Sequence, residues 1–377
     1  MKMKTTAAAL LCTTFCTSAA HAQSSVTLYG VIDEGLNYTS NAGGHSVYQL
    51  SSGYLQGNRW GLRGVENLGD GLSTVFVLES GFNLNTGALG QGGRIFGRQS
   101  YVGLSSTRYG TLTFGSQYDT LISYVAFPLI ANQTWAGYLF THPLDNDNSD
   151  SSFHIYNSVK YQSPNFNGLK FGGMYGFSNA AGFADNRTWN VAAQYISGPI
   201  TVAAGYMTIT NPGSNCTGAV PGGTAATCGV AGTATFTGSV QRIFDAGVGY
   251  TIGNAQLNLS YTNSFIGGVK SPVAYASDSL RFNNIEFNTT YWLTPTIMLG
   301  AMYDYTNFER NGSTGKFSGH WNEIGIQANY RLSKRTDVYC QAVHERGTGV
   351  TANILGSAGA SSGNIQTVAR LGFRHLF

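Results

Sequence analysis

Segments that alternate apolar and polar residues with a period of two run through most of this chain. In the stretch "AQLNLSYTN", Leu257, Leu259 and Tyr261 fall on one face. Asn258 and Ser260 fall on the other face. Successive side chains of a β-strand point to opposite sides, so a period of two indicates a strand with one apolar and one polar face. The stretches "EIGIQANYRL" and "NNIEFNTTYWL" repeat the pattern, and an all-β fold is expected.

Composition helps to separate two kinds of all-β fold. In a soluble sandwich the apolar faces form a core, whereas in an outer-membrane barrel they contact lipid and the polar faces line a wet lumen. Charged residues make up only 10% of the chain, against roughly 25% in typical soluble proteins. Aromatic residues gather near the ends of the apolar faces, for example Tyr291, Tyr303 and Tyr330. Short turns such as "SGP", "IGN" and "LTP" also alternate with long polar loops, and together these features favour the barrel.

Sixteen strand-like segments can be counted along the chain. They begin near Val26, Arg59, Leu72, Ile95, Thr111, His154, Leu169, Thr188, Ile200, Ile243, Ala255, Leu280, Thr296, Trp321, Thr336 and Asn364. An even number lets an antiparallel sheet close, and about sixteen strands enclose an aqueous channel. No segment after the N-terminal region has the run of about 18 apolar residues that a membrane-spanning helix needs. The sequence therefore predicts a transmembrane 16-stranded antiparallel β-barrel.

The N-terminal region is predicted to be a secretory signal peptide covering residues 1–22. Lys2 and Lys4 supply positive charge, a short apolar stretch follows, and residues 20–22 form an A-x-A cleavage site. The barrel is then expected to occupy residues 23–377. Export places the chain in a compartment where disulfides persist.

Three cysteines remain after this cleavage. Cys216 and Cys228 lie twelve residues apart in a Gly-, Pro- and Thr-rich loop at about 211–240. They are predicted to form a disulfide that constrains the loop, because no other Cys or His lies near enough to complete a zinc site. Cys340 is expected to be a small apolar residue on a strand. Neither a metal nor a cofactor is predicted.

One connection is too long and too apolar to be an ordinary loop. At about 120–153 it reads "TLISYVAFPLIANQTWAGYLFTHPLDNDNSDSSF". Exposed to solvent, it would form a sticky patch, and loops of this length usually have a function. Folding into the barrel against the inner wall would bury it and narrow the channel. We call it the constriction loop.

Acidic residues are confined to the two ends of the constriction loop. Residues 120–144 contain no Asp or Glu, whereas Asp119 precedes them and Asp145, Asp147 and Asp150 follow. The cluster "DNDNSD" could offer hard oxygen ligands to Ca²⁺. The favoured interpretation is a loop base that hydrogen-bonds to the wall.

The chain resembles the general diffusion porins of Gram-negative bacteria, in their beta-proteobacterial form. The resemblance rests on "SSVTLYGVIDEGLNY", "RWGLRGVENLGDGLSTVFVLESGFN", "GRQSYVGLSSTRYGTLTFGSQYD", "HPLDNDNSD", "YNSVKYQSPNF" and the ending "LGFRHLF". It implies a homotrimer of sixteen-stranded barrels in the cell outer membrane, with the third loop folded inward. It also implies contact with outer-membrane lipid and lipopolysaccharide.

The C-terminal segment alternates arginines with aromatic residues. Arg370 and Arg374 are expected to face lumen water, and Phe373 and Phe377 to face lipid. The resemblance further implies that Phe373 and Phe377 belong to the signal read by the outer-membrane assembly machinery.

The resemblance also nominates residues that line the pore constriction. The basic candidates share the inward face of their segments and are Arg59, Arg63, Arg94, Arg98 and Lys160. Ser100 is expected on that face too. Glu79 is their expected acidic partner, and Asp119 is the acid at the start of the constriction loop. Alternatively, these residues are ordinary lumen charges paired with nearby carboxylates.

These features predict a water-filled channel for passive diffusion of small hydrophilic solutes and ions, with a modest preference for anions. The alternative is a substrate-specific channel for sugars or organic acids, with Trp135, Tyr138 and Phe140 as an aromatic track. An enzyme is not expected, because the histidines are scattered outside any recognisable catalytic motif. Nucleic acid is not an expected partner, since the formal charge is only +3 and no lysine-rich run occurs.

Glu34 falls on the outward face and is predicted to lie near the rim or in a subunit interface.

Overall fold

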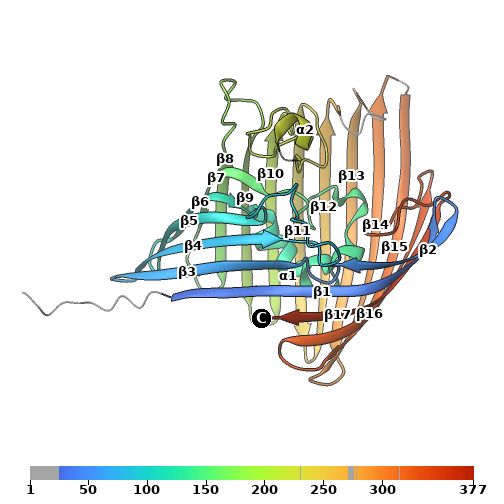
Figure 1. The fold of residues 1–377 in the computed structure, drawn as a ribbon, viewed down its shortest axis with the longest axis horizontal. Coiled ribbons are helices and arrows are strands. Elements are labelled where there is room, and N and C mark those ends of the chain that lie inside the picture. The colour runs from blue at the N-terminus through green and yellow to red at the C-terminus, as the bar shows by residue number, and fades with distance from the viewer. Residues whose placement is uncertain (1–24, 230, 271–275, 277, 314) are drawn as a thin grey trace, which may run out of the picture.

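The computed structural model describes residues 25–229, 231–270, 276, 278–313 and 315–377. The expected signal peptide, residues 1–22, lies outside these residues. Seventeen strands form one antiparallel sheet (Figure 1). Their bounds are β1 Ser25–Ala42, β2 His45–Ser52, β3 Arg59–Gly69, β4 Leu72–Gly81, β5 Gln99–Ser106, β6 Gly110–Gln117, β7 Ile155–Gln162, β8 Leu169–Gly176, β9 Arg187–Ser197, β10 Ile200–Thr210, β11 Val240–Ile252, β12 Ala255–Gly267, β13 Ser279–Trp292, β14 Ile297–Gly312, β15 Gly315–Arg331, β16 Thr336–Thr348 and β17 Ile365–Leu376.

The first and last strands close the sheet into a barrel. β17 pairs with β1 from Val31↔Leu376 to Thr39↔Val368, and the two strands lie side by side in Figure 1. β2 and β3 follow one another along the other side of β1, since β3 pairs with its first half and β2 with its second half. Seventeen strands therefore fill sixteen positions, and the predicted 16-stranded antiparallel barrel is confirmed.

The alternation seen in the sequence sorts side chains between the two faces of the wall. On β13, Ile285 and Phe287 are 49% and 46% exposed on the outer face, whereas Asn284 and Glu286 are fully buried on the inner face. Cys340 is exposed on the outer face of β16, opposite Leu371 of β17. No helix among the described residues is long and apolar enough to cross a membrane.

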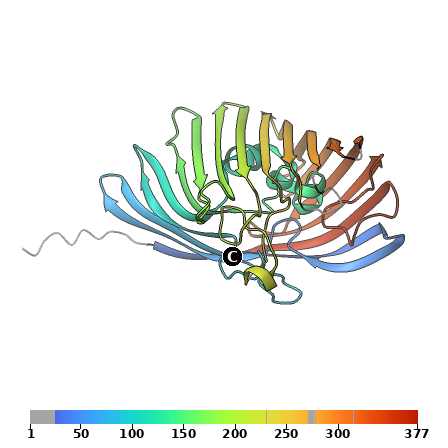
Figure 2. The same cartoon turned by 90° about the horizontal axis from the view of Figure 1, so that it is seen from above.

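The constriction loop between β6 and β7 lies on the inner side of the wall (Figure 2). It contains the short helical turns η1 Ile122–Ala126, α1 Phe127–Leu129, η2 Asn132–Ala136, η3 Tyr138–Phe140 and η4 Pro143–Asp145. Leu139 and Phe140 pack against Met302, Val343 and Val368, whose side chains come from the inner faces of β14, β16 and β17. These contacts bury the apolar residues that made this connection unusual.

Several details differ from the sequence expectations, among them the start of β15 at Gly315 instead of near Trp321. β2 was not anticipated, because this short strand is mostly polar and exposed. β5 begins at Gln99 rather than near Ile95. Gln99 is paired with Glu79 of the inner face, so the next residue, Ser100, points outward opposite Leu78. The expectation of an inward Ser100 was therefore wrong.

One of the two C-terminal arginines, Arg370, also differs from expectation. Arg374 reaches the lumen with its side chain 22% exposed, whereas the side chain of Arg370 is fully buried in an ion pair with Asp33. Arg370 therefore serves the closure of the barrel rather than contact with lumen water. Phe377 lies beside β1, where its N–H donates to the carbonyl of Gly30 and its carbonyl accepts from the Gly30 N–H, both at 3.1 Å.

Candidate pore constriction

Residues 53–58, between β2 and β3, leave the sheet and project toward the constriction loop; we call them the inward link. The carboxylate of Asp33 accepts hydrogen bonds from three successive backbone N–H groups of the link at 3.1 to 3.3 Å. Asn58 in turn accepts from the backbone N–H of Asp33 at 2.6 Å. Gly53 begins the link with φ of 79°, a left-handed conformation that glycine adopts without strain. Asp33 therefore determines how the chain leaves the wall.

The constriction loop touches the inward link at Gly137. The N–H of Tyr138 donates to the carbonyl of Tyr54 at 2.7 Å, and the two tyrosine rings meet edge-on at 5.7 Å. Gly137 has φ of 73°, and a Cβ there would collide with the Tyr54 carbonyl. Glycine is thus required both for the backbone conformation and for the close approach.

A cavity of about 350 Å³ lies between the constriction loop and the wall that carries the inward link. Its lining comes from parts of the chain that are distant in sequence, namely residues 53–59, 79–99 and 118–151 and the C-terminal Arg374. The wall residues are Gly53, Tyr54, Leu55, Gln56, Gly57, Arg59, Glu79, Arg98, Gln99 and Arg374. The residues from the loop region are Tyr118, Phe127, Asn132, Gln133, Thr134, Trp135, Gly137, Tyr138, Asp150 and Ser151.

Glu79 is the wall carboxylate of this cavity, and its charge is largely taken up by its neighbours. Arg98 Nε lies 2.9 Å from Glu79 Oε1, and the Tyr29 hydroxyl donates to Glu79 Oε2 at 2.9 Å. Arg98 Nη2 also donates to the Tyr118 hydroxyl. The expected pairing of Glu79 with a basic residue is present in this geometry.

Arg59 gives the cavity its uncompensated positive charge. Among the described residues, no carboxylate lies within ion-pair distance of Arg59. Asp150 is the one loop carboxylate in the lining. Burial, together with the neighbouring charge of Asp145, raises the pKa of Asp150 well above its ordinary value. Even with Asp150 ionised, Arg59, Arg98 and Arg374 outnumber the two carboxylates of the lining, Glu79 and Asp150. The described lining is therefore net positive.

A second cavity of about 200 Å³ adjoins the first and shares Thr134, Trp135 and Arg374 with it. Arg374 lies between the two, with Nη2 2.5 Å from Asp337 Oδ2. Arg331 also lines the second cavity, with its guanidinium 3.9 Å from the centre of the Trp292 ring. Sequence reasoning missed Arg331 as a pore residue, although its place on the polar face of "EIGIQANYRL" was a usable signal.

Four of the predicted constriction residues do not line the first cavity. Arg63 is exposed further along β3, with its guanidinium 5.3 Å from the Tyr29 ring centre. Lys160 is buried under the start of the loop, where Nζ donates to the Tyr118 carbonyl and the Ser123 hydroxyl, both at 2.8 Å. Lys160 therefore anchors the constriction loop and does not line the first cavity.

Asp119 and Arg94 also lie outside the cavity lining. Asp119 is buried inside the loop base, where it accepts from the Ile122 N–H at 2.9 Å and from Asn148 at 3.0 Å. Arg94 lies in the connection between β4 and β5 and donates to the carbonyl of Ala231 at 2.8 Å.

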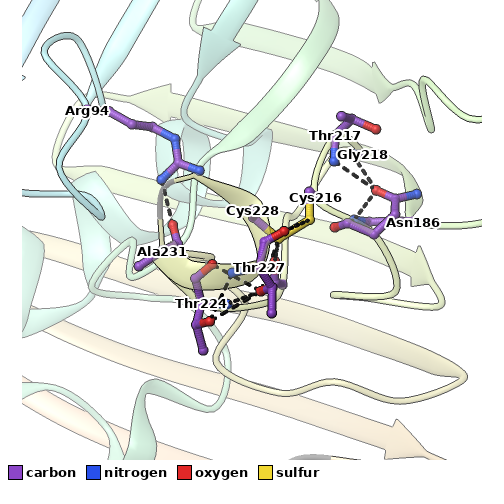
Figure 3. The surroundings of a disulfide bond; sticks show 11 residues. Arg94, Asn186, Cys216, Thr217, Gly218, Thr224, Thr227, Cys228 and Ala231 are labelled. Atoms are coloured by element: carbon purple, nitrogen blue, oxygen red, sulfur yellow. Dashed lines mark hydrogen bonds between the residues drawn. A yellow bond between two sulfur atoms is a disulfide. The ribbon is translucent and has the colours of Figure 1, made fainter.

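The predicted disulfide is present between Cys216 and Cys228 (Figure 3). It lies in the connection between β10 and β11, which includes the short helix α2 Ala225–Cys228. The contact between Arg94 and Ala231 joins this disulfide loop to the β4–β5 connection (Figure 3).

The acids at the base of the constriction loop are held by hydrogen bonds. Asp145 accepts from the backbone N–H groups of Asp150 and Ser152 at 2.9 and 3.1 Å. Asp147 accepts from the Thr262 hydroxyl of β12 at 2.6 Å. These contacts match the loop-base interpretation of the "DNDNSD" cluster. Within the described ranges, no group of three acidic, His or Cys side chains has a geometry suited to a metal ion.

Comparison with known proteins gives a consistent family assignment. A model of the Gram-negative porin family matches residues 6–349. An outer membrane porin protein of Bordetella pertussis is 31% identical, over 89% of this chain and 92% of its own. Outer membrane porin protein 32 of Delftia acidovorans is 26% identical, over 95% and 96%.

Solved structures share the fold. The anion-selective porin from Comamonas acidovorans matches with a TM-score of 0.72 at 21% identity, over 94% of this chain and 100% of its own. OmpT of Vibrio cholerae in its trimer form matches with a TM-score of 0.65 at 16% identity, over 94% and 99%. The chain belongs to the Gram-negative porin family. It is an outer-membrane diffusion channel.

Proposed function

We propose that this channel passes small hydrophilic solutes and favours anions through the cavity beside Arg59. The observation that carries the proposal is the charge of the lining. Arg59, Arg98 and Arg374 supply three positive charges, whereas the constriction loop offers no carboxylate between 120 and 144. The similar Comamonas porin is anion-selective, which supports the same preference here. A narrow passage with walls of low dielectric focuses such a field on the passing ion.

The test is a reversal potential across a planar bilayer with a salt gradient. We expect the sign that indicates anion permeation, and a preference that weakens at high salt because fixed charges are then screened. A clear cation preference would overturn the proposal. Protonation of Asp150, whose pKa is raised by burial, removes negative charge from the lining as pH falls, so the anion preference should not weaken in mild acid.

A substrate-specific channel is the second candidate, and one feature of the cavity favours it. Phe127 is 45% exposed although it lines the cavity instead of contacting lipid. Trp135 and Tyr138 line the same space, whereas the predicted third member of the track, Phe140, is fully buried against the wall. Small conductance steps that one class of sugar or carboxylate blocks would favour this candidate over general diffusion.

We further propose that the channel works as a homotrimer in contact with outer-membrane lipid and lipopolysaccharide, and that Phe373 and Phe377 are read by the assembly machinery. OmpT of Vibrio cholerae, which shares the fold, has been solved in a trimer form. Glu34 supports an interface on this side of the barrel. It lies on the outer face of β1 opposite Phe373, and a carboxylate facing lipid at mid-depth is costly.

Replacing Glu34 by leucine is expected to weaken the trimer, because a polar interface contact would be lost. The measurement is the temperature at which the oligomer dissociates in detergent, and we expect it to fall. Glu66→Leu is the matched control, since Glu66 is an exposed outer-face carboxylate near the end of β3. Unchanged or improved resistance of the Glu34 variant would place this residue outside the interface.

A further inference from the structure

Four carboxylates lie side by side on the inner face of the barrel wall, behind the constriction loop. Glu286, Asp304, Glu323 and Glu345 lie on β13 to β16, and each is directly opposite the next in the strand register. All four are 0 to 1% exposed. Like charges directly opposite on neighbouring strands repel, and a buried carboxylate without a counter-charge is costly. We call these four residues the acidic row.

His142 of the constriction loop is the base that meets the acidic row. Its Nε2 lies 3.4 Å from Glu286 Oε2 and 3.6 Å from Asp304 Oδ1. Its Nδ1 lies 2.6 Å from Oδ2 of Asp147, at the base of the same loop. The His142 side chain is only 1% exposed. Among the described residues, no other base forms an ion pair with the row.

The contacts of His142 connect the part of the wall that carries the acidic row, which we call the far wall, to the residues that line the pore. Asp147 is held by Thr262 of β12 and by Asn284 of β13, at 2.6 and 3.3 Å. On the side of the pore, the hydroxyl of Thr141, next to His142, donates to the Tyr138 carbonyl at 2.9 Å. Tyr138 lines the first cavity and bonds to the inward link. The loop therefore bridges the lumen from the acidic row to the wall of Arg59.

We propose that His142 is a positioning residue for the pore. Its imidazolium ties the constriction loop to Glu286 and Asp304 of the far wall and so fixes the distance between the pore-lining face of the loop and Arg59. This inference rests on the proposed diffusion channel. Apolar packing of Leu139 and Phe140 holds the loop in the barrel, whereas the charge of His142 holds it in one position.

The charges around His142 determine the pH range of this anchor. Burial would lower the pKa of His142, but Asp147, Asp304 and Glu286 outweigh burial and raise it well above 6.5. Burial would raise the pKa of Asp147, but His142 and Thr262 lower it to about 2. The contribution of a base with a raised pKa is present below its unfolded value and is lost as pH rises through the folded value. The contribution of an acid with a lowered pKa is lost as pH falls toward 2.

Other acids face this site from the neighbouring elements. Glu323 and Glu345 continue the row on β15 and β16. Asp245 of β11 and Asp145 of the loop also act on the site through their charges. Without the imidazolium, protons would have to neutralise this group of acids. The effect of removing His142 should therefore depend on pH.

The first experiment records single channels of the full-length protein carrying His142→Asn. Asparagine removes the charge and keeps a short polar side chain. At neutral pH we expect the current to fluctuate between levels, with a variance about tenfold above that of the wild type, because losing a buried ion pair shifts a two-position equilibrium by a decade or more. At about pH 5 the fluctuation should subside, since buried carboxylates take up protons readily. His45→Asn, an exposed histidine at the start of β2, is the matched control and should match the wild type.

Two further measurements separate the role of charge from that of packing. The double variant His142→Asn/Asp304→Asn removes one charge of each sign and should be steadier at neutral pH than the single variant. The wild-type channel should begin to fluctuate as pH is raised step by step toward the pKa of His142 in the folded protein, which lies well above 6.5. Steady traces of the His142 variant at neutral pH would overturn the inference. So would fluctuation that neither acid nor the second substitution reduces, which would indicate a packing defect.

Outcomes for the inference and for the proposed function are distinguishable in the same recordings. The reversal potential reports the charge of the lining, whereas the current variance reports the position of the loop. If the His142 variant does not insert, the alkaline series on the wild type decides, and steady current throughout the folded alkaline range would overturn the inference.

Discussion

Arg59→Glu is expected to turn the pore from anion preference to cation preference. The substitution changes the charge of the cavity lining by two units at a residue that has no ion-pair partner among the described residues. Two unit charges about 4 Å apart interact by about 1 kcal/mol in water, so the permeability ratio should change about tenfold or more. The reversal potential in a salt gradient measures this change directly, and the shift should be largest at low salt.

Arg63→Glu is the matched control for this prediction. Arg63 lies on the same strand and face as Arg59, but it does not line the cavity. Its inversion should move the reversal potential much less. Arg59→Gln should abolish part of the preference without reversing it. Equal shifts for the Arg59 and Arg63 variants would mean that selectivity is set by the lumen as a whole and not by this cavity.

The barrel could be predicted from sequence because its two faces contact different media. Lipid outside and water or polar contacts inside impose a period of two on every long strand, as on β13, and each strand carries this pattern independently of its partners. β2 and the inward link gave no such pattern. The inward link is positioned by Asp33, whose buried partner Arg370 lies 337 residues away in sequence. Alternation within one segment cannot predict a contact between residues so far apart in sequence.

The pore lining was predictable only in part for a similar reason. Arg59, Arg98 and Lys160 all lie on or beside an inward face, and the sequence does not distinguish them. The path of the constriction loop distinguishes these three residues, because the loop covers Lys160 and leaves Arg59 and Arg98 beside the cavity. His142 was passed over because its role depends on the acidic row, whose members are spread over four strands. The alternation predicts that each acid lies on the inner face of its strand. It does not predict the register between strands, which places the four acids directly opposite one another.

The constriction combines two kinds of interaction, and these have different consequences. The apolar contacts of the loop are non-directional and hold it inside the barrel. Hydrogen bonds and ion pairs at the inward link and the acidic row set its position, because they depend on distance and direction. Substitutions at the polar contacts should therefore change conduction more than the amount of folded barrel. Arg370 is the exception, because it lies where the barrel closes.

Arg370→Met is expected to cause the largest loss of stability of any single substitution considered in this protein. Arg370 Nη2 lies 2.9 Å from Asp33 Oδ1, and both side chains are fully buried. Arg370 Nε also donates to the Tyr339 hydroxyl at 2.8 Å, and Nη1 donates to Ser51 Oγ at 2.9 Å. The guanidinium thus joins β17 to β16, to β1 and to the end of β2. Removing it leaves the Asp33 carboxylate buried without a counter-charge, which costs roughly 3–5 kcal/mol.

The measurement is unfolding of the refolded barrel in detergent, followed by far-ultraviolet circular dichroism over a denaturant series. Arg374→Met is the matched control, because Arg374 pairs with Asp337 from a side chain that is 22% exposed, and such pairs contribute about 1 kcal/mol or less. The double variant Asp33→Asn/Arg370→Met should recover much of the stability, since it removes the stranded charge. An Arg370 variant no weaker than the Arg374 variant would show that Asp33 finds another way to be neutralised. In that case the inward link, and with it the cavity beside Arg59, would not depend on the closure of the barrel.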